Sequence, residues 1–149
     1  MKLLLILAIV AVALAPLLHF LPSKRQKQQA AMREKAALAG LFVEFRNLPE
    51  VGNSAQMPQP PKGSVIYYAK RLPPSRSREM RRGAWLRRGE MWQGLTAGSG
   101  LPPALARLPE SIMAVSLEEG SCGVYWQEQG ELEDVDVIAT SVNNWSEQL

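Results

Sequence analysis

The most apolar stretch of the chain lies at its N-terminal end. Residues 3–21 contain 17 apolar residues and are interrupted only by Pro16 and His19. As a helix this run would be about 28 Å long, and the hydrocarbon core of a bilayer is about 30 Å thick. A buried helix of a globular domain rarely lacks a polar face over so many turns. The pattern therefore predicts a single-pass transmembrane helix, with residues 1–22 as the anchor.

A cleaved signal peptide is the alternative for this segment. Lys2 provides a basic start and residues 13–15 (Ala-Leu-Ala) resemble a cleavage site, but Pro16 directly after them disfavours cleavage. Five basic residues follow the apolar run within residues 23–40, opposed only by Glu34. Positive charge next to a membrane segment favours the cytoplasmic side. We therefore expect an uncleaved signal anchor with the C-terminal domain in the cytoplasm; a periplasmic domain is the alternative.

Residues 23–40 are predicted to form a basic juxtamembrane helix. Ser23 is suited to cap its start, the residues after it are strong helix formers, and Gly40 is suited to its C-terminal end. Because its apolar residues are mostly alanine, we expect a stalk with a thin packing face.

Residues 41–149 carry the alternation and turn signals of a small folded domain. Segments rich in alternating, β-branched or aromatic residues predict strands and hairpins. After residue 130, apolar residues recur every three or four positions up to Trp145, which predicts an amphipathic helix. The predicted order is strand 41–48, Pro-rich loop 49–64, strand 65–72, Arg-rich segment 70–88, hairpin 84–93, helical turn 102–108, hairpin 112–127 and helix 132–145.

Together these patterns predict an α+β fold. It consists of an N-terminal transmembrane helix and a basic helical stalk, followed by a small domain of antiparallel strands with a C-terminal amphipathic helix. Apart from the apolar run, the chain holds enough apolar residues for one modest core but not for two domains. This disfavours a multi-domain enzyme.

Composition excludes several kinds of site. The single cysteine, Cys122, rules out an intrachain disulfide and a cysteine-rich zinc site. The single histidine, His19, lies in the apolar run and leaves none for a catalytic triad. The chain has no phosphate-binding loop, dinucleotide-binding fingerprint or nucleophile elbow. We therefore expect no catalytic residue, metal site, cofactor or small-molecule substrate, and predict that the protein is not an enzyme.

Charge is divided unevenly along the chain. All 17 basic residues lie in residues 1–107 with five of the 14 acids, and residues 108–149 hold the other nine acids. The basic residues could contact anionic lipid, an acidic partner or nucleic-acid phosphates, or pair with the acidic part of the same chain. No nucleic-acid-binding motif is present, which makes nucleic acid the weakest of these partners. The candidate lipid or partner contacts are Lys24, Arg25, Lys27, Arg76, Arg78, Arg81, Arg82, Arg87 and Arg88.

The layout of the chain resembles a known family. The apolar run with the following LPSKRQKQQAAMREKAALAGLFVEF, and the later LPESIMAVSLEEGSCGVYWQEQGELEDVDVIATSV, are similar to uncharacterised small single-pass inner-membrane proteins of Gram-negative bacteria, often labelled preprotein translocase subunit YajC. The resemblance implies a bacterial inner-membrane location and a cytoplasmic domain, and it implies no activity. YajC subunits have a short Gly- and Val-rich β-segment where this chain has the Pro-rich loop and a longer α+β domain.

From these observations we expect a membrane-tethered accessory or interaction protein, associated with a membrane protein complex such as the preprotein translocase. One alternative is a lipid- or nucleic-acid-binding module that acts through the Arg-rich segment. The other is a small enzyme that uses Asp and Glu without a recognisable motif.

Overall fold

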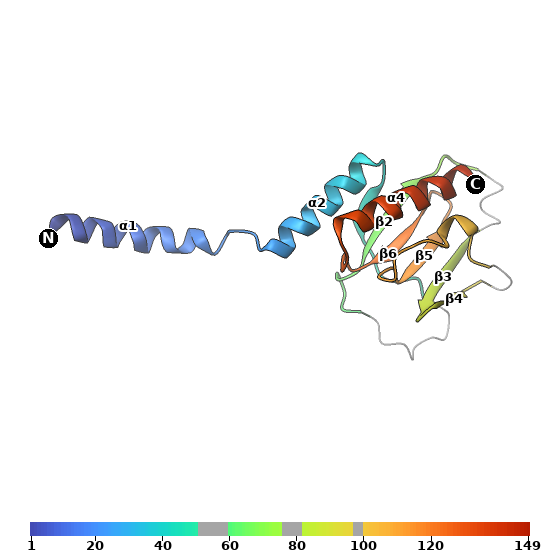
Figure 1. Ribbon diagram of the computed structural model, residues 1–149, viewed down its shortest axis with the longest axis horizontal. Coiled ribbons are helices and arrows are strands. Elements are labelled where there is room, and N and C mark those ends of the chain that lie inside the picture. Colours follow the sequence, from blue (N-terminus) through green and yellow to red (C-terminus); the bar gives the residue numbers. More distant parts are fainter. Residues whose placement is uncertain (51–59, 76–81, 97–99) are drawn as a thin grey trace. The chain divides into compact units, whose positions relative to one another are not determined.

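The computed structural model describes residues 1–50, 60–75, 82–96 and 100–149. The chain divides into two compact units, Met1–Ala30 and Ala31–Leu149 (Figure 1). The first unit contains one helix and the start of a second, and the second unit contains the sheet.

The first unit begins with helix α1 (Lys2–Leu18), which has 17 residues and no buried side chain. Its last turn contains Pro16, and the amide of His19 bonds to the carbonyl of Pro16 at 3.1 Å, which tightens the end of the helix. The chain then leaves the helix before Pro22, because a proline disfavours the helical conformation in the residue that precedes it. At 1.5 Å per residue, α1 is about 25 Å long, less than the bilayer core of about 30 Å.

The predicted transmembrane anchor is therefore wrong. Among the residues that the structure describes, no helix combines the length and the apolar character that crossing a membrane requires. The physical reason is that the apolar run does not form one helix, since α1 ends at Leu18 and residues 19–21 form a turn. The predicted single-pass location in the inner membrane, with either a cytoplasmic or a periplasmic domain, rests on that anchor and falls with it.

Helix α2 (Lys24–Leu38) begins and ends where the sequence predicts. Ser23 and Gln26 cap its start reciprocally: the amide of Gln26 bonds to Ser23 Oγ at 3.2 Å, and the amide of Ser23 bonds to Gln26 Oε1 at 2.8 Å. At its end, Gly40 has a φ of +83° and the amide of Leu41 bonds back to the last helical turn at 3.0 Å. Glycine adopts this left-handed conformation without steric cost, which explains the stop.

The second unit is built around a six-stranded antiparallel sheet. The strand order is β1-β2-β6-β5-β3-β4, so β1 and β4 form the two edges. Neighbours β5 and β6 form a hairpin, as do β3 and β4, whereas β2 pairs with β6 from a distant part of the sequence. The strands are β1 (Phe42–Phe45), β2 (Ile66–Arg71), β3 (Gly83–Arg88), β4 (Met91–Gly94), β5 (Ala114–Leu117) and β6 (Ser121–Trp126).

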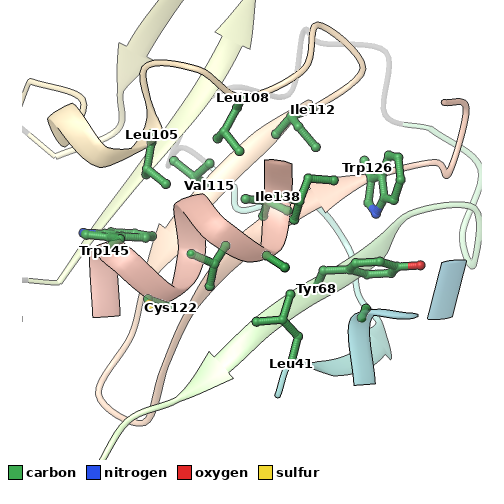
Figure 2. Close-up of a cluster of buried hydrophobic side chains, with 14 of the residues drawn as sticks. Leu41, Tyr68, Leu105, Leu108, Ile112, Val115, Cys122, Trp126, Ile138 and Trp145 are labelled. Carbon is green, nitrogen blue, oxygen red and sulfur yellow. The ribbon is translucent and has the colours of Figure 1, made fainter. Parts of the chain in front are cut away.

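Helices cover one face of this sheet. Helix α4 (Leu132–Glu147), the short 3-10 helix η1 (Pro103–Leu105) and the later turns of α2 contribute buried side chains to the main core (Figure 2). Alternate strand residues face these helices, among them Tyr68 and Trp126, which are fully buried. Cys122 is buried in the same core.

The fold of the second unit is α+β, and most of its elements lie close to their predicted ranges. Strand β2, both hairpins and α4 match the predicted segments. Strand β1 is shorter than predicted, because the chain leaves the sheet after Arg46, whose amide still bonds to the carbonyl of Val65 at 3.3 Å. Most of the predicted Pro-rich loop, residues 51–59, lies outside the described residues.

Candidate functional site

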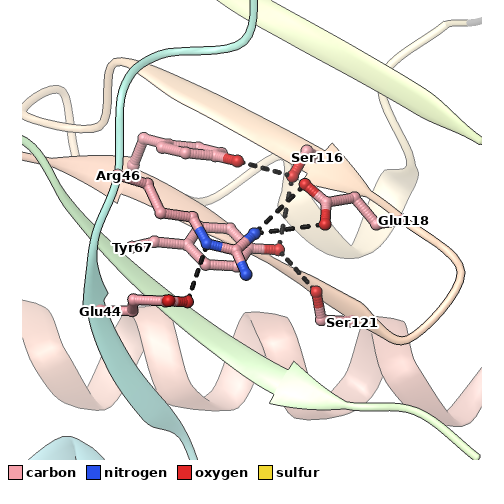
Figure 3. A network of polar contacts seen from close by, with 7 residues as sticks. Glu44, Arg46, Tyr67, Ser116, Glu118 and Ser121 are labelled. Carbon is pink, nitrogen blue, oxygen red and sulfur yellow. Dashed lines mark hydrogen bonds and ion pairs between the residues drawn. The ribbon is translucent and has the colours of Figure 1, made fainter.

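The sheet face turned away from α4 carries a cluster of polar side chains (Figure 3). Side chains alternate along a strand, so Tyr67 and Tyr125 point to this face while their neighbours point into the main core. Both tyrosines are buried, and a small apolar cluster surrounds them. This face therefore buries aromatic rings whose hydroxyl groups need polar partners.

Four hydroxyl groups join the strands on this face. The hydroxyl of Tyr67 lies 3.3 Å from the hydroxyls of both Ser116 and Ser121, and Ser116 Oγ lies 3.2 Å from the Tyr125 hydroxyl. Burial raises the pKa of Tyr67 and that of Tyr125. Both side chains therefore stay protonated at neutral pH and act as hydrogen-bonding groups, not as bases.

Arg46 lies over this hydroxyl cluster. Its guanidinium carbon is 4.5 Å from the centre of the Tyr67 ring. Its Nε donates to Glu44 at 2.9 Å, and a terminal nitrogen donates to Glu118 at 3.2 Å. Burial alone would lower the pKa of Arg46, but the hydrogen bond to Glu44 and the charge of Glu118 outweigh it and raise the pKa. The guanidinium is therefore a fixed cation between two carboxylates.

The charges around Arg46 do not cancel. Two carboxylates share one guanidinium, and the side chains of Glu44 and Glu118 remain 53% and 49% exposed. Each carboxylate has lone pairs that Arg46 does not use, because a carboxylate can accept about four hydrogen bonds. The cluster thus presents a surplus of negative charge and free acceptor capacity to the solvent.

A pocket of about 440 Å³ opens beside this cluster. Its wall comes from the chain at the end of β1 and just after it, and from the face of the sheet that carries Tyr125. We call it the Arg46 pocket; its lining residues are Phe45, Arg46, Asn47, Pro49, Gly63, Glu118 and Tyr125.

Strand β1 borders the pocket and forms an edge of the sheet. The amide of Arg46 bonds to the carbonyl oxygen of Val65, the residue just before β2. In an antiparallel pair, every second residue directs both its amide and its carbonyl group to the partner strand. The amide and carbonyl groups of Val43 and Phe45 therefore point away from β2. Among the residues that the structure describes, no strand pairs with β1 on that side, and the Phe45 side chain is 57% exposed. Such an edge can accept a further strand.

A second polar cluster lies on the helix-covered face. Arg33 of α2 donates two hydrogen bonds to Glu128, at 2.9 and 2.6 Å, and the hydroxyl of Tyr68 donates a third at 2.7 Å. The Glu128 side chain is 3% exposed, and its backbone has a φ of +53°. The hydrogen bond to Glu128 raises the pKa of Arg33, and burial raises that of Tyr68. This ion pair fastens the later part of α2 to the end of β6, and it gives no opening to a ligand.

The predicted basic contacts are distributed over both units and over residues that the structure does not describe. Lys24, Arg25 and Lys27 lie exposed in the first turn of α2, in the first unit. Arg82 pairs with Glu119 at 2.7 Å. Arg76, Arg78 and Arg81 lie outside the described residues.

The two remaining members of the set are neighbours on β3. Arg87 is half-buried and bonds to the carbonyl oxygens of Pro109 and Gly89 at 2.8 and 3.1 Å. Arg88 is exposed, and its side chain points to the opposite face of the strand. Arg82 and Arg87 bond to other groups of the same chain, which agrees with the alternative of pairing within the protein. A role of the whole set in binding lipid or a partner stays a prediction.

Part of the Arg46 pocket can be recognised from the sequence pattern. The alternation of residues 41–48 already placed Glu44 and Arg46 on one face of a strand, and Glu118 followed an alternating strand. Nothing local shows that the side chains of Arg46 and Glu118 reach each other across the open face of the sheet, since the two residues are 72 positions apart and β2 and β6 lie between their strands. The pocket was therefore missed.

Neither polar cluster places a nucleophile beside a general base, and within the described ranges no group of three His, Cys, Asp or Glu side chains could hold a metal ion. The structure thus offers a pocket, an open strand edge and a surplus of carboxylate charge.

Comparisons with models of protein families, with curated proteins and with solved structures find no match for this chain. No family is therefore assigned, and the resemblance to small inner-membrane proteins stays an expectation from the sequence.

Proposed function

We propose that this protein is a non-catalytic interaction module that binds an extended segment of a partner protein. The segment adds as a strand to the free edge of β1, and one of its side chains enters the Arg46 pocket. The observation that carries the proposal is the position of the pocket: its lining includes Phe45 and Arg46, the last residue of the edge strand and the residue after it.

Strand addition supplies affinity through backbone hydrogen bonds. Val43 and Phe45 each offer one amide and one carbonyl at the edge, so β1 can form up to four hydrogen bonds with an added strand. Backbone bonds alone do not distinguish one sequence from another. Specificity must come from side chains that alternate along the added strand, and the Arg46 pocket lies where such a side chain would reach the open face.

The other edge of the sheet is less suited to this role. Strand β4 has the same length as β1, and Met91 on it is 75% exposed. None of the residues that line the Arg46 pocket belongs to β4 or to β3 beside it. An added strand there would find backbone partners but would not reach the Arg46 pocket.

The test starts from a display library of short random peptides, panned against the full-length protein. The selected peptides are labelled with a fluorophore, and their affinities for wild type, Val43→Pro and Val43→Thr are measured by anisotropy. Proline at this position removes the outward amide, which makes no bond to β2, while threonine keeps both the amide and the β-branched shape. We expect about tenfold weaker binding by Val43→Pro and about twofold or less for Val43→Thr.

Denaturant unfolding of both variants verifies that the loss of binding is not a loss of fold. Equal affinities of the two folded variants would contradict strand addition. The same conclusion would follow if the selected peptides left the backbone resonances of Val43 and Phe45 unchanged in NMR spectra.

A further inference from the structure

The cluster beside the Arg46 pocket holds unequal charge; of its two carboxylates, Glu118 lines the pocket and Glu44 does not. Arg46 donates to Glu44 and Glu118 at 2.9 and 3.2 Å, and both carboxylates remain about half exposed. Their outward lone pairs are available to a second donor. An anion brought to the same place would meet two carboxylates and a guanidinium that is already engaged by both.

The walls of the pocket suit a long side chain with a cationic end. Pro49 and the small exposed part of Tyr125 supply apolar surface, and Asn47 and Glu118 supply polar groups. Lysine and arginine bury an aliphatic stem against apolar surface and keep the charged end at a polar site. The Phe45 ring lies on the other face of the strand, under Arg33, so it contributes its backbone to the pocket.

The cluster already shows how it accommodates a cation. The guanidinium of Arg46 lies flat over the Tyr67 ring, with a carboxylate on either side (Figure 3). Burial raises the pKa of Tyr125; the charge of Glu118 adds to that rise and the charge of Arg46 opposes it. The half-exposed carboxylate of Glu118 remains open to the solvent, whereas the rings of Tyr67 and Tyr125 are buried.

We infer that the Arg46 pocket selects a lysine or arginine side chain of the bound segment, an inference that rests on the proposed strand addition. In an added strand, side chains alternate between the two faces of the sheet. A residue that pairs with the Glu44 or Arg46 end of β1 and points to the open face places its side chain at the pocket. The partner is thus an extended protein segment with a basic residue at that one position, flanked by residues that tolerate a strand.

The test uses the full-length protein and peptides of one selected sequence that carry lysine, glutamine or glutamate at the pocket position. Their affinities are measured for wild type, Glu118→Gln and Glu119→Gln. The two variants make the same charge change at neighbouring positions, but Glu119 bonds to Arg82 and does not line the pocket. The comparison therefore separates a local contact from the effect of net charge.

We expect the lysine peptide to bind wild type about tenfold more tightly than the glutamine peptide, and the glutamate peptide to bind most weakly. Glu118→Gln should reduce the preference for lysine to about twofold, while Glu119→Gln should leave it nearly unchanged. Added salt should weaken the preference as well, because the pair is partly exposed.

Failure of this inference is distinguishable from failure of the strand addition. If the lysine and glutamine peptides bind equally and Val43→Pro weakens both, cation selection is overturned and strand addition stands. If no peptide binds, strand addition is overturned. The pocket is then tested alone with Nα-acetyl-lysine methylamide, whose side chain keeps its charge, through the NMR resonance of the Arg46 Nε–H group. A shift that Glu118→Gln abolishes supports cation binding, and the absence of a shift overturns it.

Discussion

Replacing Arg33 by alanine removes the counter-charge from a carboxylate that is almost completely buried. The Glu128 side chain is 3% exposed and accepts two hydrogen bonds from Arg33 and one from Tyr68. The substitution deletes both guanidinium bonds and leaves the Tyr68 hydroxyl in place. Since a buried charge without a counter-ion is unfavourable, Arg33→Ala should destabilise the fold far more than the loss of an exposed arginine.

The magnitude follows from the burial of the two partners. Removing one member of a buried ion pair costs about 3–5 kcal/mol. The Arg33 side chain is itself 37% exposed, so water can enter part of the space that it leaves and solvate Glu128. We therefore expect a loss at the lower end, about 3 kcal/mol of unfolding free energy.

Denaturant unfolding at neutral pH measures this loss. Arg25→Ala is the matched control, because Arg25 lies exposed on the same helix, and it should change the free energy of unfolding by about 0.5 kcal/mol or less. The double variant Arg33→Ala, Glu128→Gln carries no buried charge at this site, so it should be more stable than Arg33→Ala alone. Equal losses for Arg33→Ala and Arg25→Ala, or no recovery in the double variant, would refute the reasoning.

Two further predictions concern the two faces of the sheet. Burial raises the pKa of all three tyrosines above the ordinary value of about 10, so ultraviolet titration should show none of them ionising near pH 10 in the folded protein. Because the pKa values are higher in the folded than in the unfolded protein, the free energy of unfolding should fall as the pH rises past 10. A tyrosine that ionises reversibly near pH 10 without unfolding would contradict this. Gly123→Ala should cost about 3 kcal/mol or more, because the added Cβ would collide with Ala69 and the carbonyl oxygen of Tyr68 on the paired strand, while Gly100→Ala, which meets no neighbouring atom, should leave the thermal midpoint unchanged.

Local patterns in the sequence predict most of the elements of the second unit. Alternating and β-branched residues locate β2 and both hairpins, and the helical spacing that ends at Trp145 locates α4. Ser23 and Gly40 mark the ends of α2 for stereochemical reasons that need no tertiary information. The end of α1 was misjudged, since the continuous apolar run hid the turn that precedes Pro22.

Long-range pairing is what the sequence does not show. Nothing local indicates that β2 lies between β1 and β6, and that arrangement brings Arg46 together with Glu118. Glu128 is a harder case, because glutamate is rarely buried and a charged residue just after a strand predicts an exposed loop. Its partner, Arg33, lies 95 positions away, and the pattern of basic residues in α2 does not single it out.

Hydrogen exchange of the β1 amides in complex with a selected peptide tests strand addition most directly. The amides of Val43 and Phe45 point away from β2, and in the free protein they should exchange faster than the amide of Glu44, which faces β2. The account predicts that saturation with the peptide slows exchange at Val43 and Phe45 and changes Glu44 little. Unchanged exchange at Val43 and Phe45 in the saturated complex would contradict the account.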